Sequence, residues 1–451
     1  MNLELKPTKD NIYKTINEDI INRNNCLRYF INTLYKINDI NVISLNGDWG
    51  AGKTFFIKQS IEVINSINSK DDSKIKNFID WIKCTYLNDM DYAGQLMPIY
   101  YNAWEYDANE DPILTIMYSI INNNPKLKDF DKCDETLKEK IKRIISCFKG
   151  SVTFETKNGM TCGIELQCND NKKEKITESV YTIENIKSVF SEILNEIKIE
   201  KANKVVIFID ELDRCNPNFA IRLMERVKHF FEREDYLFVF STNIEELQYT
   251  VKKFYGEGID GYSYLDKFFD LQFTLNDIDT DKYINSLNVL NNNRNSYINS
   301  IAKIMCKNFE FSLRKINRYF LLISLVKEQI YGACEKDSIL SYCILFPILL
   351  AVKIKDINEY NKILSGQGRQ ELKNIVVHDN TLVKNLNCFF GCDELDGTLN
   401  FDFEKLYELI FIIKKNDGFA DEKIGNVYIS YSVVRKDLIE LLSFMNSFVR
   451  I

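Results

Sequence analysis

The chain has 451 residues, of which 45% are hydrophobic and 27% are charged, so it is globular and long enough for roughly two or three domains rather than disordered. Its formal net charge of −7, without a polybasic tail, argues against sequence-independent binding of nucleic acid through net charge and leaves only a local basic groove for such binding. Because no basic start followed by an apolar core opens the chain, we expect no signal peptide and a cytoplasmic protein.

A glycine-rich stretch follows the first predicted strand, which is the apolar run Val42 to Leu45. It reads Gly47-Asp48-Trp49-Gly50-Ala51-Gly52-Lys53-Thr54 and opens into an apolar helix. A strand, such a turn and a helix in this order are typical of a P-loop, whose backbone N–H groups and helix N-terminus bind phosphate. The eight residues are therefore predicted to bind a nucleotide, with Lys53 neutralising the β- and γ-phosphates and Thr54 supplying a hydroxyl ligand to Mg²⁺.

Apolar residues at helical spacing over residues 9–37 predict helices ahead of this strand, beside the nucleotide. In many P-loop ATPases the corresponding segment covers the adenine. Arg23 therefore has two interpretations: it contacts the base, or it is a solvated arginine on a helix.

A second core strand is predicted to begin at Met97, and polar residues follow it at the position where strand C-termini face ligands in a parallel sheet. Asn102 and Glu105 are therefore candidates to approach the metal or the attacking water. The alternative is a strand edge that is closed by a packed tryptophan, Trp104.

Helical spacing over residues 112–148 gives way to a different pattern. Residues 151–175 alternate like a hairpin around Asn158-Gly159 and end in a charged run, so we interpret about 150–176 as a polar insertion. Helical periodicity resumes over residues 177–199.

Five apolar β-formers, Val205 to Ile209, predict a strand buried on both faces, and carboxylates follow at its C-terminal end. Asp210 is placed to hold Mg²⁺ through water, and Glu211 to polarise the attacking water. Asp213 adds a second acid and Arg214 a local cation. Downstream of a P-loop, this pattern predicts a hydrolytic centre.

Another buried strand is predicted at residues 236–243, and it ends on Thr242 and Asn243, which we expect between the acidic strand and the γ-phosphate as a sensor. The helix predicted at residues 218–234 carries basic residues that are either solvated or, in a ring or dimer, the source of an arginine finger acting in trans. These residues are Arg222, Arg226, Lys228 and Arg233.

Six stretches resemble the KAP family of P-loop NTPases, and the resemblance covers about residues 8–325. In chain order they are Gly47-Asp-Trp-Gly-Ala-Gly-Lys-Thr, Tyr101-Asn-Ala-Trp-Glu-Tyr, Ile209-Asp-Glu-Leu-Asp-Arg-Cys, Ser241-Thr-Asn, Tyr264-Leu-Asp-Lys-Phe-Phe-Asp-Leu-Gln-Phe and Phe311-Ser-Leu-Arg-Lys-Ile-Asn-Arg-Tyr-Phe. The resemblance implies an α/β P-loop fold of the additional-strand type, with a parallel sheet flanked by helices, and slow, switch-like hydrolysis of Mg-ATP. It also implies that Arg314 is a sensor arginine that reaches the phosphates from a helical lid, and we count it as catalytic with Glu211, Asp213 and Asn243.

From about residue 276 onward the chain is predicted to be mostly helical. We expect a P-loop domain at 1–275, a helical lid at 276–335 and a C-terminal helical domain at 336–451. The apolar stretch Ile339 to Val352 is shorter than the roughly twenty residues of a membrane helix, so it predicts a core helix and no integral membrane segment. Many family members insert membrane helices between the P-loop and the acidic strand, whereas the insertion here is polar.

The expected function is an ATP-dependent conformational switch, with ATP and Mg²⁺ as ligands, in bacterial defence against phage, because the family includes a phage-exclusion protein. The two histidines have no partner at catalytic spacing, so we expect the output to pass through protein partners in a complex, or through a homo-oligomer. A nucleotide-binding scaffold without turnover and an ATPase that remodels nucleic acid or protein are the alternatives.

Overall fold

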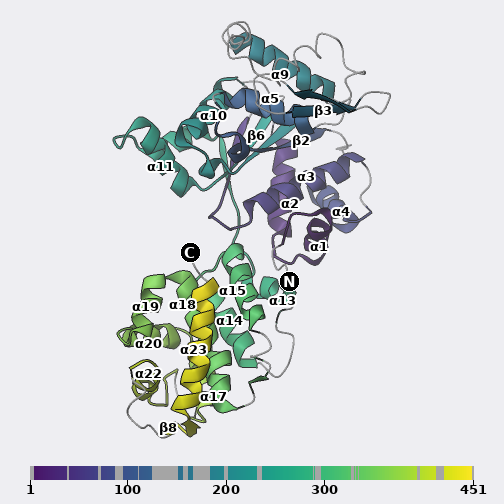
Figure 1. Ribbon diagram of the computed structural model, residues 1–451. Helices are drawn as coiled ribbons and strands as arrows, with labels where there is room; N and C mark the ends of the chain where they lie inside the picture. The colour runs from purple at the N-terminus through teal and green to yellow at the C-terminus, as the bar shows by residue number, and fades with distance from the viewer. Residues whose placement is uncertain are drawn as a thin grey trace. The chain divides into compact units, whose positions relative to one another are not determined.

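The computed structural model shows two compact units (Figure 1). The N-terminal unit comprises Lys6–Asp19 and Arg23–Asp277, and the C-terminal unit consists chiefly of Ile278–Ile451 with Ile20–Asn22. The structure describes residues 5–37, 40–69, 73–86, 95–109, 111–123, 151–155, 161–165, 183–197, 202–230, 236–287, 289, 296–326, 330, 332–333, 335–393, 397–412 and 421–448.

The N-terminal unit is built on a five-stranded sheet in which all neighbouring strands are parallel. Its strands are β1 (Val42–Asn46), β2 (Leu96–Asn102), β5 (Lys204–Asp210), β6 (Tyr236–Thr242) and β7 (Leu271–Thr274), in the order β2-β5-β6-β1-β7. β6 therefore lies between the strand that precedes the glycine-rich loop and the strand with the acidic end. This is the position of the additional strand, so the predicted α/β fold is confirmed.

Burial explains which strands lie at the centre of the sheet. Every residue of β5 and β6 is buried, and both strands are rich in β-branched and aromatic residues, which suits strands covered on both faces. β7, at one edge, alternates between half-buried and exposed side chains. Because β5, β6 and β1 are parallel neighbours, their carboxyl ends meet at one edge of the sheet.

Helices cover both faces of this sheet (Figure 1). One hydrophobic core joins the strands to α5 (Pro112–Asn123), α9 (Ile183–Ile197), α10 (Pro217–Phe230) and α11 (Ile244–Tyr255). On the other side, α2 (Asn24–Lys36) and α3 (Lys53–Ser69) pack through ring contacts of Phe30 and Phe56 with Phe273 of β7. The other helices that the structure describes in this unit are α1 (Lys9–Glu18), α4 (Lys76–Tyr86), η1 (Ala103–Tyr106), η2 (Leu212–Arg214) and α12 (Gly261–Phe268).

The predicted hairpin is formed by β3 (Ser151–Glu155) and β4 (Thr161–Glu165), which pair antiparallel in a sheet of their own. Its turn, with Asn158-Gly159, and the charged run after it lie outside the described residues. A helix was predicted over 112–148. Its first part is α5, and residues 124–148 lie outside the described residues.

The C-terminal unit is mostly helical, as predicted, with one short antiparallel hairpin. Its elements are α13 (Thr280–Leu287), α14 (Ser296–Asn308), α15 (Leu313–Leu325), α17 (Lys336–Ser338), η4 (Ile339–Leu345), α18 (Phe346–Lys355), α19 (Ile357–Leu364), α20 (Arg369–Val377), α21 (Asn380–Phe389), α22 (Phe403–Tyr407), η5 (Glu408–Ile412), β8 (Glu422–Ile424), β9 (Val427–Ile429) and α23 (Tyr431–Phe448). One hydrophobic core contains side chains from both 276–335 and 336–451, the segments expected as a lid and a C-terminal domain. In the structure these two segments therefore pack as one body.

The apolar stretch predicted as a core helix lies inside the helical run Lys336–Lys355. Among the described residues this is the one helix with the length and composition of a membrane crossing, yet 83% of its most apolar window is buried in the fold. Its apolar side chains pack in the core of the C-terminal unit, as expected for a core helix.

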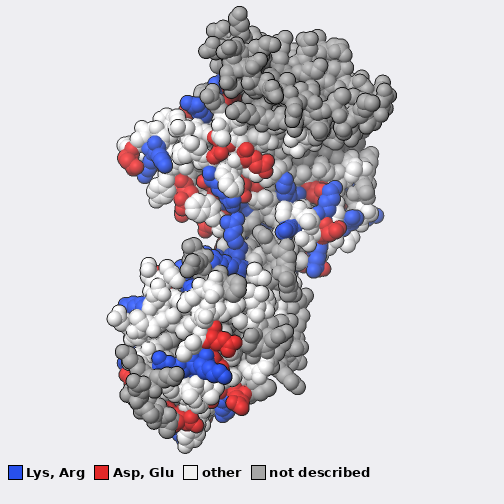
Figure 2. Space-filling view, in the orientation of Figure 1, with Lys and Arg blue, Asp and Glu red and all other residues white. Residues whose placement is uncertain are grey.

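Charges of both signs are mixed on the face of the C-terminal unit that Figure 2 shows. Arg369 forms ion pairs with Glu404 at 2.8 Å and with Glu408 at 2.9 Å, and Lys373 pairs with Glu404 at 3.1 Å. Because these basic side chains have acidic partners, this cluster does not favour a groove for nucleic acid.

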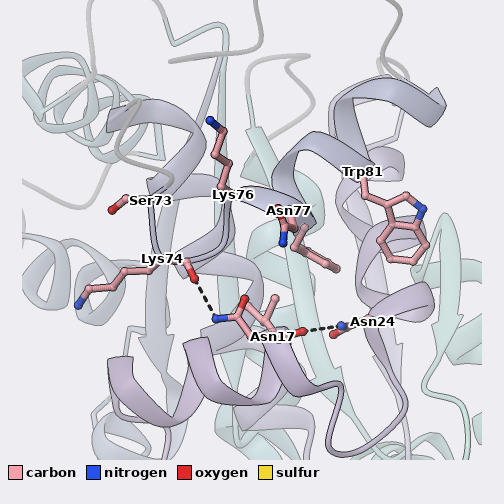
Figure 3. A pocket seen from close by; sticks show the side chains of 9 residues that line it. Asn17, Asn24, Ser73, Lys74, Lys76, Asn77 and Trp81 are labelled. Atoms are coloured by element: carbon pink, nitrogen blue, oxygen red, sulfur yellow. Dashed lines mark hydrogen bonds between the residues drawn. The ribbon is translucent and has the colours of Figure 1, made fainter.

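α4 had no predicted role, and the structure places it beside α1 and α2 around a cavity of about 620 Å³ (Figure 3). The Arg28 guanidinium lies 3.7 Å from the centre of the Trp81 ring and so joins α2 to α4. Asn17 Nδ2 donates to the carbonyl of Lys74 at 2.9 Å and ties the end of α1 to the segment before α4. The cavity therefore lies among the N-terminal helices, and none of the predicted site residues lines it.

Candidate nucleotide-binding site

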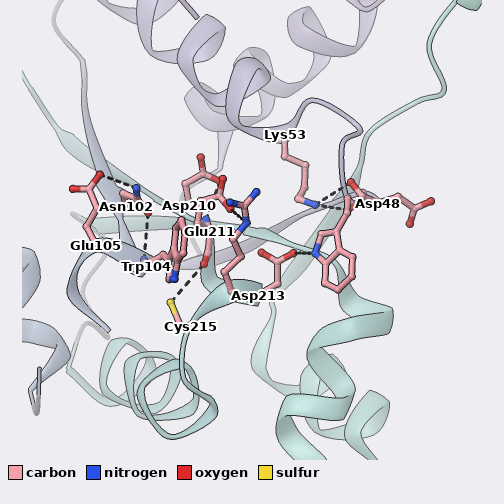
Figure 4. A network of polar contacts seen from close by, with 12 residues as sticks. Asp48, Lys53, Asn102, Trp104, Glu105, Asp210, Glu211, Asp213 and Cys215 are labelled. Atoms are coloured by element: carbon pink, nitrogen blue, oxygen red, sulfur yellow. Dashed lines mark hydrogen bonds and ion pairs between the residues drawn. The ribbon is translucent and has the colours of Figure 1, made fainter. Parts of the chain in front are cut away.

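The glycine-rich loop connects β1 to α3 and curves around the end of the Lys53 side chain. Gly50 and Gly52 have φ angles of 80° and 91°, which a residue with a side chain rarely adopts. Lys53 Nζ donates to the carbonyls of Gly47 at 2.5 Å and Asp48 at 3.2 Å (Figure 4). Loop and ammonium together form the cradle that the sequence predicts for phosphate.

Lys53 lies within electrostatic reach of the acidic end of β5. Burial lowers the pKa of its ammonium, and the negative charges of Asp213, Asp210, Glu211 and Asp48 act in the opposite direction. The structure therefore brings the predicted phosphate-binding lysine and the predicted acids to one edge of the sheet (Figure 4).

Hydrogen bonds fasten the start of the loop to the end of β6. The Gly47 amide donates to the Thr242 carbonyl at 3.1 Å, and the hydroxyls of Ser44 and Thr242 lie 2.7 Å apart. Asn243 follows directly at this edge, and its Oδ1 accepts from the Glu246 amide at 3.4 Å as the N-cap of α11. Asn243 thus lies at this edge with its side-chain oxygen capping a helix, and its role as a sensor stays a prediction.

Asp210 is the last residue of β5 and is only 1% exposed. Its Oδ2 accepts from the Tyr100 hydroxyl at 3.1 Å, and its Oδ1 accepts from the Glu211 amide at 3.0 Å. Within the described part of the chain, Asp210 forms no ion pair. A buried carboxylate without a paired cation, together with the Thr54 hydroxyl at the start of α3, is a donor set that fits Mg²⁺.

Glu211 sits at a strained point of the backbone and is held by its neighbour. Its φ of 60° is in the left-handed region, which is uncommon for a residue other than glycine. Its Oε2 lies 2.5 Å from Arg214 Nε, and the Arg214 guanidinium lies 5.4 Å from the centre of the Trp104 ring. The sequence suggested a cation here, but not that this cation pairs with the predicted water-polarising acid.

Asp213 contacts the glycine-rich loop directly. Trp49 Nε1 donates to Asp213 Oδ2 at 2.5 Å, and the Trp49 side chain is nevertheless 51% exposed. The contact bridges the loop and the acidic end of β5 across the place expected for the phosphates (Figure 4). Both residues were predicted to belong to the site, whereas their contact was not.

Asn102 and Glu105 lie at the same edge of the sheet as Asp210, and their approach to a metal or water stays a prediction. Asn102 pairs in register with Asp210, and its Nδ2 donates to Glu105 Oε1 at 2.8 Å. The alternative, a strand edge closed by a packed tryptophan, is wrong, because Trp104 is 51% exposed.

Arg23 is buried, at 4% exposed, so the interpretation as a solvated arginine is wrong. Its NH1 donates to the Ala51 carbonyl at 2.6 Å, and its Nε and NH2 donate to the Asn276 carbonyl at 2.9 and 2.5 Å. The guanidinium therefore supports the glycine-rich loop from behind and ties it to the segment after β7. Its contact with an adenine stays a prediction.

The predicted arginines of other segments differ in their surroundings. Arg226 lies 3.7 Å from Asp111, and Lys228 donates to the Phe268 carbonyl at 2.9 Å, so both are engaged within the unit. Arg222 is exposed on α10 and stays a candidate to act in trans, whereas Arg233 lies outside the described residues. Arg314 is exposed near the start of α15 in the C-terminal unit, and its role at the phosphates stays a prediction.

Comparison with known families agrees with this geometry. A family model described as the KAP family P-loop domain matches residues 10–330, which include every predicted site residue. No curated protein matches the chain.

We expect Arg23→Met to destabilise the N-terminal unit by about 2–3 kcal/mol, because the carbonyls of Ala51 and Asn276 lose a charged donor in part-buried hydrogen bonds. Nucleotide affinity should fall as well, since one of these carbonyls belongs to the glycine-rich loop. Thermal unfolding and equilibrium nucleotide binding measure the two effects, and Lys83→Met, at an exposed site on α4, is the control. Unchanged stability and affinity in Arg23→Met would contradict the supporting role.

A second expectation concerns the Glu211–Arg214 ion pair. If Arg214 restrains Glu211, Arg214→Ala should raise basal turnover by about fivefold, the rate equivalent of ~1 kcal/mol for a partly exposed ion pair. Arg214→Lys keeps a cation and should stay near the wild-type rate. A fall in turnover in Arg214→Ala would show instead that the guanidinium assists the reaction.

Proposed function

The chain belongs to the KAP family of P-loop NTPases, and on that premise we propose that it hydrolyses Mg-ATP as a conformational switch. The observation that carries this proposal is the convergence of Lys53, Asp210 and Glu211 at one edge of the sheet. A phosphate cradle, a buried carboxylate and a second acid are the parts that phosphoryl transfer to water requires.

Each of these residues has a distinct task in the proposed reaction. The loop amides and Lys53 hold the β- and γ-phosphates, and the Lys53 ammonium exchanges the carbonyls of Gly47 and Asp48 for phosphate oxygens. Thr54 and Asp210 would hold Mg²⁺, which neutralises charge on the phosphates when bound. Glu211, once released from Arg214, orients the attacking water and accepts its proton.

The switch follows from contacts that nucleotide would replace. Lys53 is bonded within its own loop, Trp49 bridges to Asp213, and Glu211 is paired with Arg214. A γ-phosphate between the loop and β5 competes with these contacts, and its loss on hydrolysis restores them. Because Asn243 caps α11 at the same edge, that helix is a route for the change to reach the surface.

For the biological role, we propose that the chain is the ATPase component of a bacterial anti-phage defence system. The support for this role is analogy, because the KAP family includes a phage-exclusion protein. The chain has two histidines and no effector constellation in its sequence, which favours an output through partner proteins in a cytoplasmic complex or through a homo-oligomer.

A nucleotide-binding scaffold is the second candidate, and the engagement of Glu211 by Arg214 favours it over fast turnover. A remodelling ATPase is the third candidate. It would show strong stimulation of turnover by the polymer it acts on.

Phosphate release from Mg-ATP by the purified chain distinguishes these candidates. We expect slow turnover in the wild type, loss of ATP binding in Lys53→Ala, and loss of turnover with ATP binding retained in Glu211→Gln. ATP binding without any turnover in the wild type would favour the scaffold. Turnover that rises severalfold with added nucleic acid would favour the remodelling ATPase.

Survival of phage-challenged cells tests the defence role. Cells that carry the wild-type gene with its neighbouring genes should survive better than cells that carry Lys53→Ala, because the variant lacks the phosphate-binding ammonium. Equal survival at matched protein levels would rule out ATP-driven defence.

A further inference from the structure

The buried carboxylate of Asp210 has a support that the family motifs do not include. Its Oδ2 accepts a hydrogen bond from the Tyr100 hydroxyl at 3.1 Å. Tyr100 belongs to β2, the neighbour of β5, and it lies two residues before Asn102, which is the register partner of Asp210. The phenol therefore reaches the carboxylate diagonally across two paired strands.

Tyr100 is the donor in this hydrogen bond. A phenol keeps its proton at neutral pH, because its ordinary pKa is about 10. The carboxylate is acceptor-only when ionised, so the direction of this hydrogen bond is fixed. One of the two Asp210 oxygens is thus oriented by a side chain and the other by the Glu211 amide.

Tyr100 is in turn held by a lysine of α3. Lys58 Nζ lies 2.9 Å from the centre of the Tyr100 ring, and among the described residues it forms no ion pair or hydrogen bond. Within the described part of the chain, the Lys58 ammonium contacts the face of the Tyr100 ring. This cation–π contact holds the ring against α3. Burial lowers the pKa of Lys58 to about 8, so in most molecules the Lys58 ammonium is still charged at neutral pH.

We propose that Tyr100 is a positioning residue for Asp210 and that Lys58 holds Tyr100 in the orientation that lets Asp210 receive Mg²⁺. The inference rests on the proposed function, since Asp210 matters as a metal ligand only if the chain binds Mg-ATP. Groups that orient a metal ligand act on metal affinity, and their loss typically costs about 10- to 100-fold. The effect should therefore appear in the contribution of Mg²⁺ to ATP binding.

The neighbouring residue provides a matched control. Successive side chains of a strand point to opposite faces, and the Tyr101 hydroxyl lies 2.6 Å from the hydroxyl of Thr115 on α5. Tyr101→Phe therefore removes one buried hydrogen bond of the same strand without touching Asp210. Any loss that both variants share reflects stability, and a loss limited to Tyr100→Phe reflects the carboxylate.

The experiment measures ATP affinity twice, with excess Mg²⁺ and with EDTA, in a Glu211→Gln background that prevents turnover. The ratio of the two affinities is the gain due to Mg²⁺. We expect Tyr100→Phe to reduce this ratio about tenfold with little change in EDTA, and Tyr101→Phe to leave it unchanged. Thermal unfolding of each variant confirms that it is folded before the affinities are compared.

The lysine is tested in the same assay. Lys58→Met should reduce the ratio less than Tyr100→Phe, and the double variant should lose little more than Tyr100→Phe alone, because both residues act through one carboxylate. Lys58→Arg should restore the ratio, since Lys58 and Tyr100 line a cavity of about 450 Å³ with room for a guanidinium.

The outcomes separate this inference from the proposed function. A wild-type chain whose ATP affinity does not depend on Mg²⁺, or that binds no ATP, overturns the proposed function itself. A normal Mg²⁺ gain in Tyr100→Phe, beside a clear gain in the wild type, overturns the positioning role of Tyr100 alone. A larger gain in Lys58→Met would show that Lys58 competes with the metal and does not support Tyr100.

Discussion

Parallel pairing of β6 with β1 on one side and β5 on the other is the constraint on which the site depends. The three strands end together, so the phosphate-binding loop and the acids emerge side by side although more than 150 residues separate them in the sequence. The Gly47 amide and the Thr242 carbonyl extend the strand ladder into the loop. A shift of one residue in this register would turn Asp210 to the opposite face of the sheet.

The polar groups of the site satisfy one another. A buried ammonium, a buried carboxylate and a buried guanidinium are costly in a protein interior unless each finds a partner. Lys53 finds loop carbonyls, Asp210 finds a phenol and an amide, and Arg23 finds two carbonyls from distant segments. Several of these contacts use the atoms that a nucleotide would engage. On nucleotide binding, these polar groups would therefore exchange protein partners for phosphate oxygens, and few of them would be left without a hydrogen bond.

Strands that are uninterrupted apolar runs could be predicted from the sequence. The runs before the glycine-rich loop, before Asp210 and before Asn243 are all strands in the structure, because a strand covered on both faces needs apolar residues at every position. β7 was not predicted, since its four residues alternate in burial and form an edge. The short hairpin of β8 and β9 was also missed, because strands of three residues carry too little pattern to separate them from a loop.

Residue types at the site were predictable, but their contacts were not, since these depend on distances set by the whole fold. Trp49 was predicted only as one of the eight residues of the glycine-rich loop, yet its indole donates to Asp213 while about half of its surface remains in contact with solvent. An indole in this position reports optically on what lies beside it. Its emission responds to the polarity around the ring, so the chain carries an intrinsic fluorophore at the place where the phosphates are expected, alongside two other tryptophans that can be replaced one at a time. Nucleotide entry and departure can then be followed in the unlabelled protein, in real time.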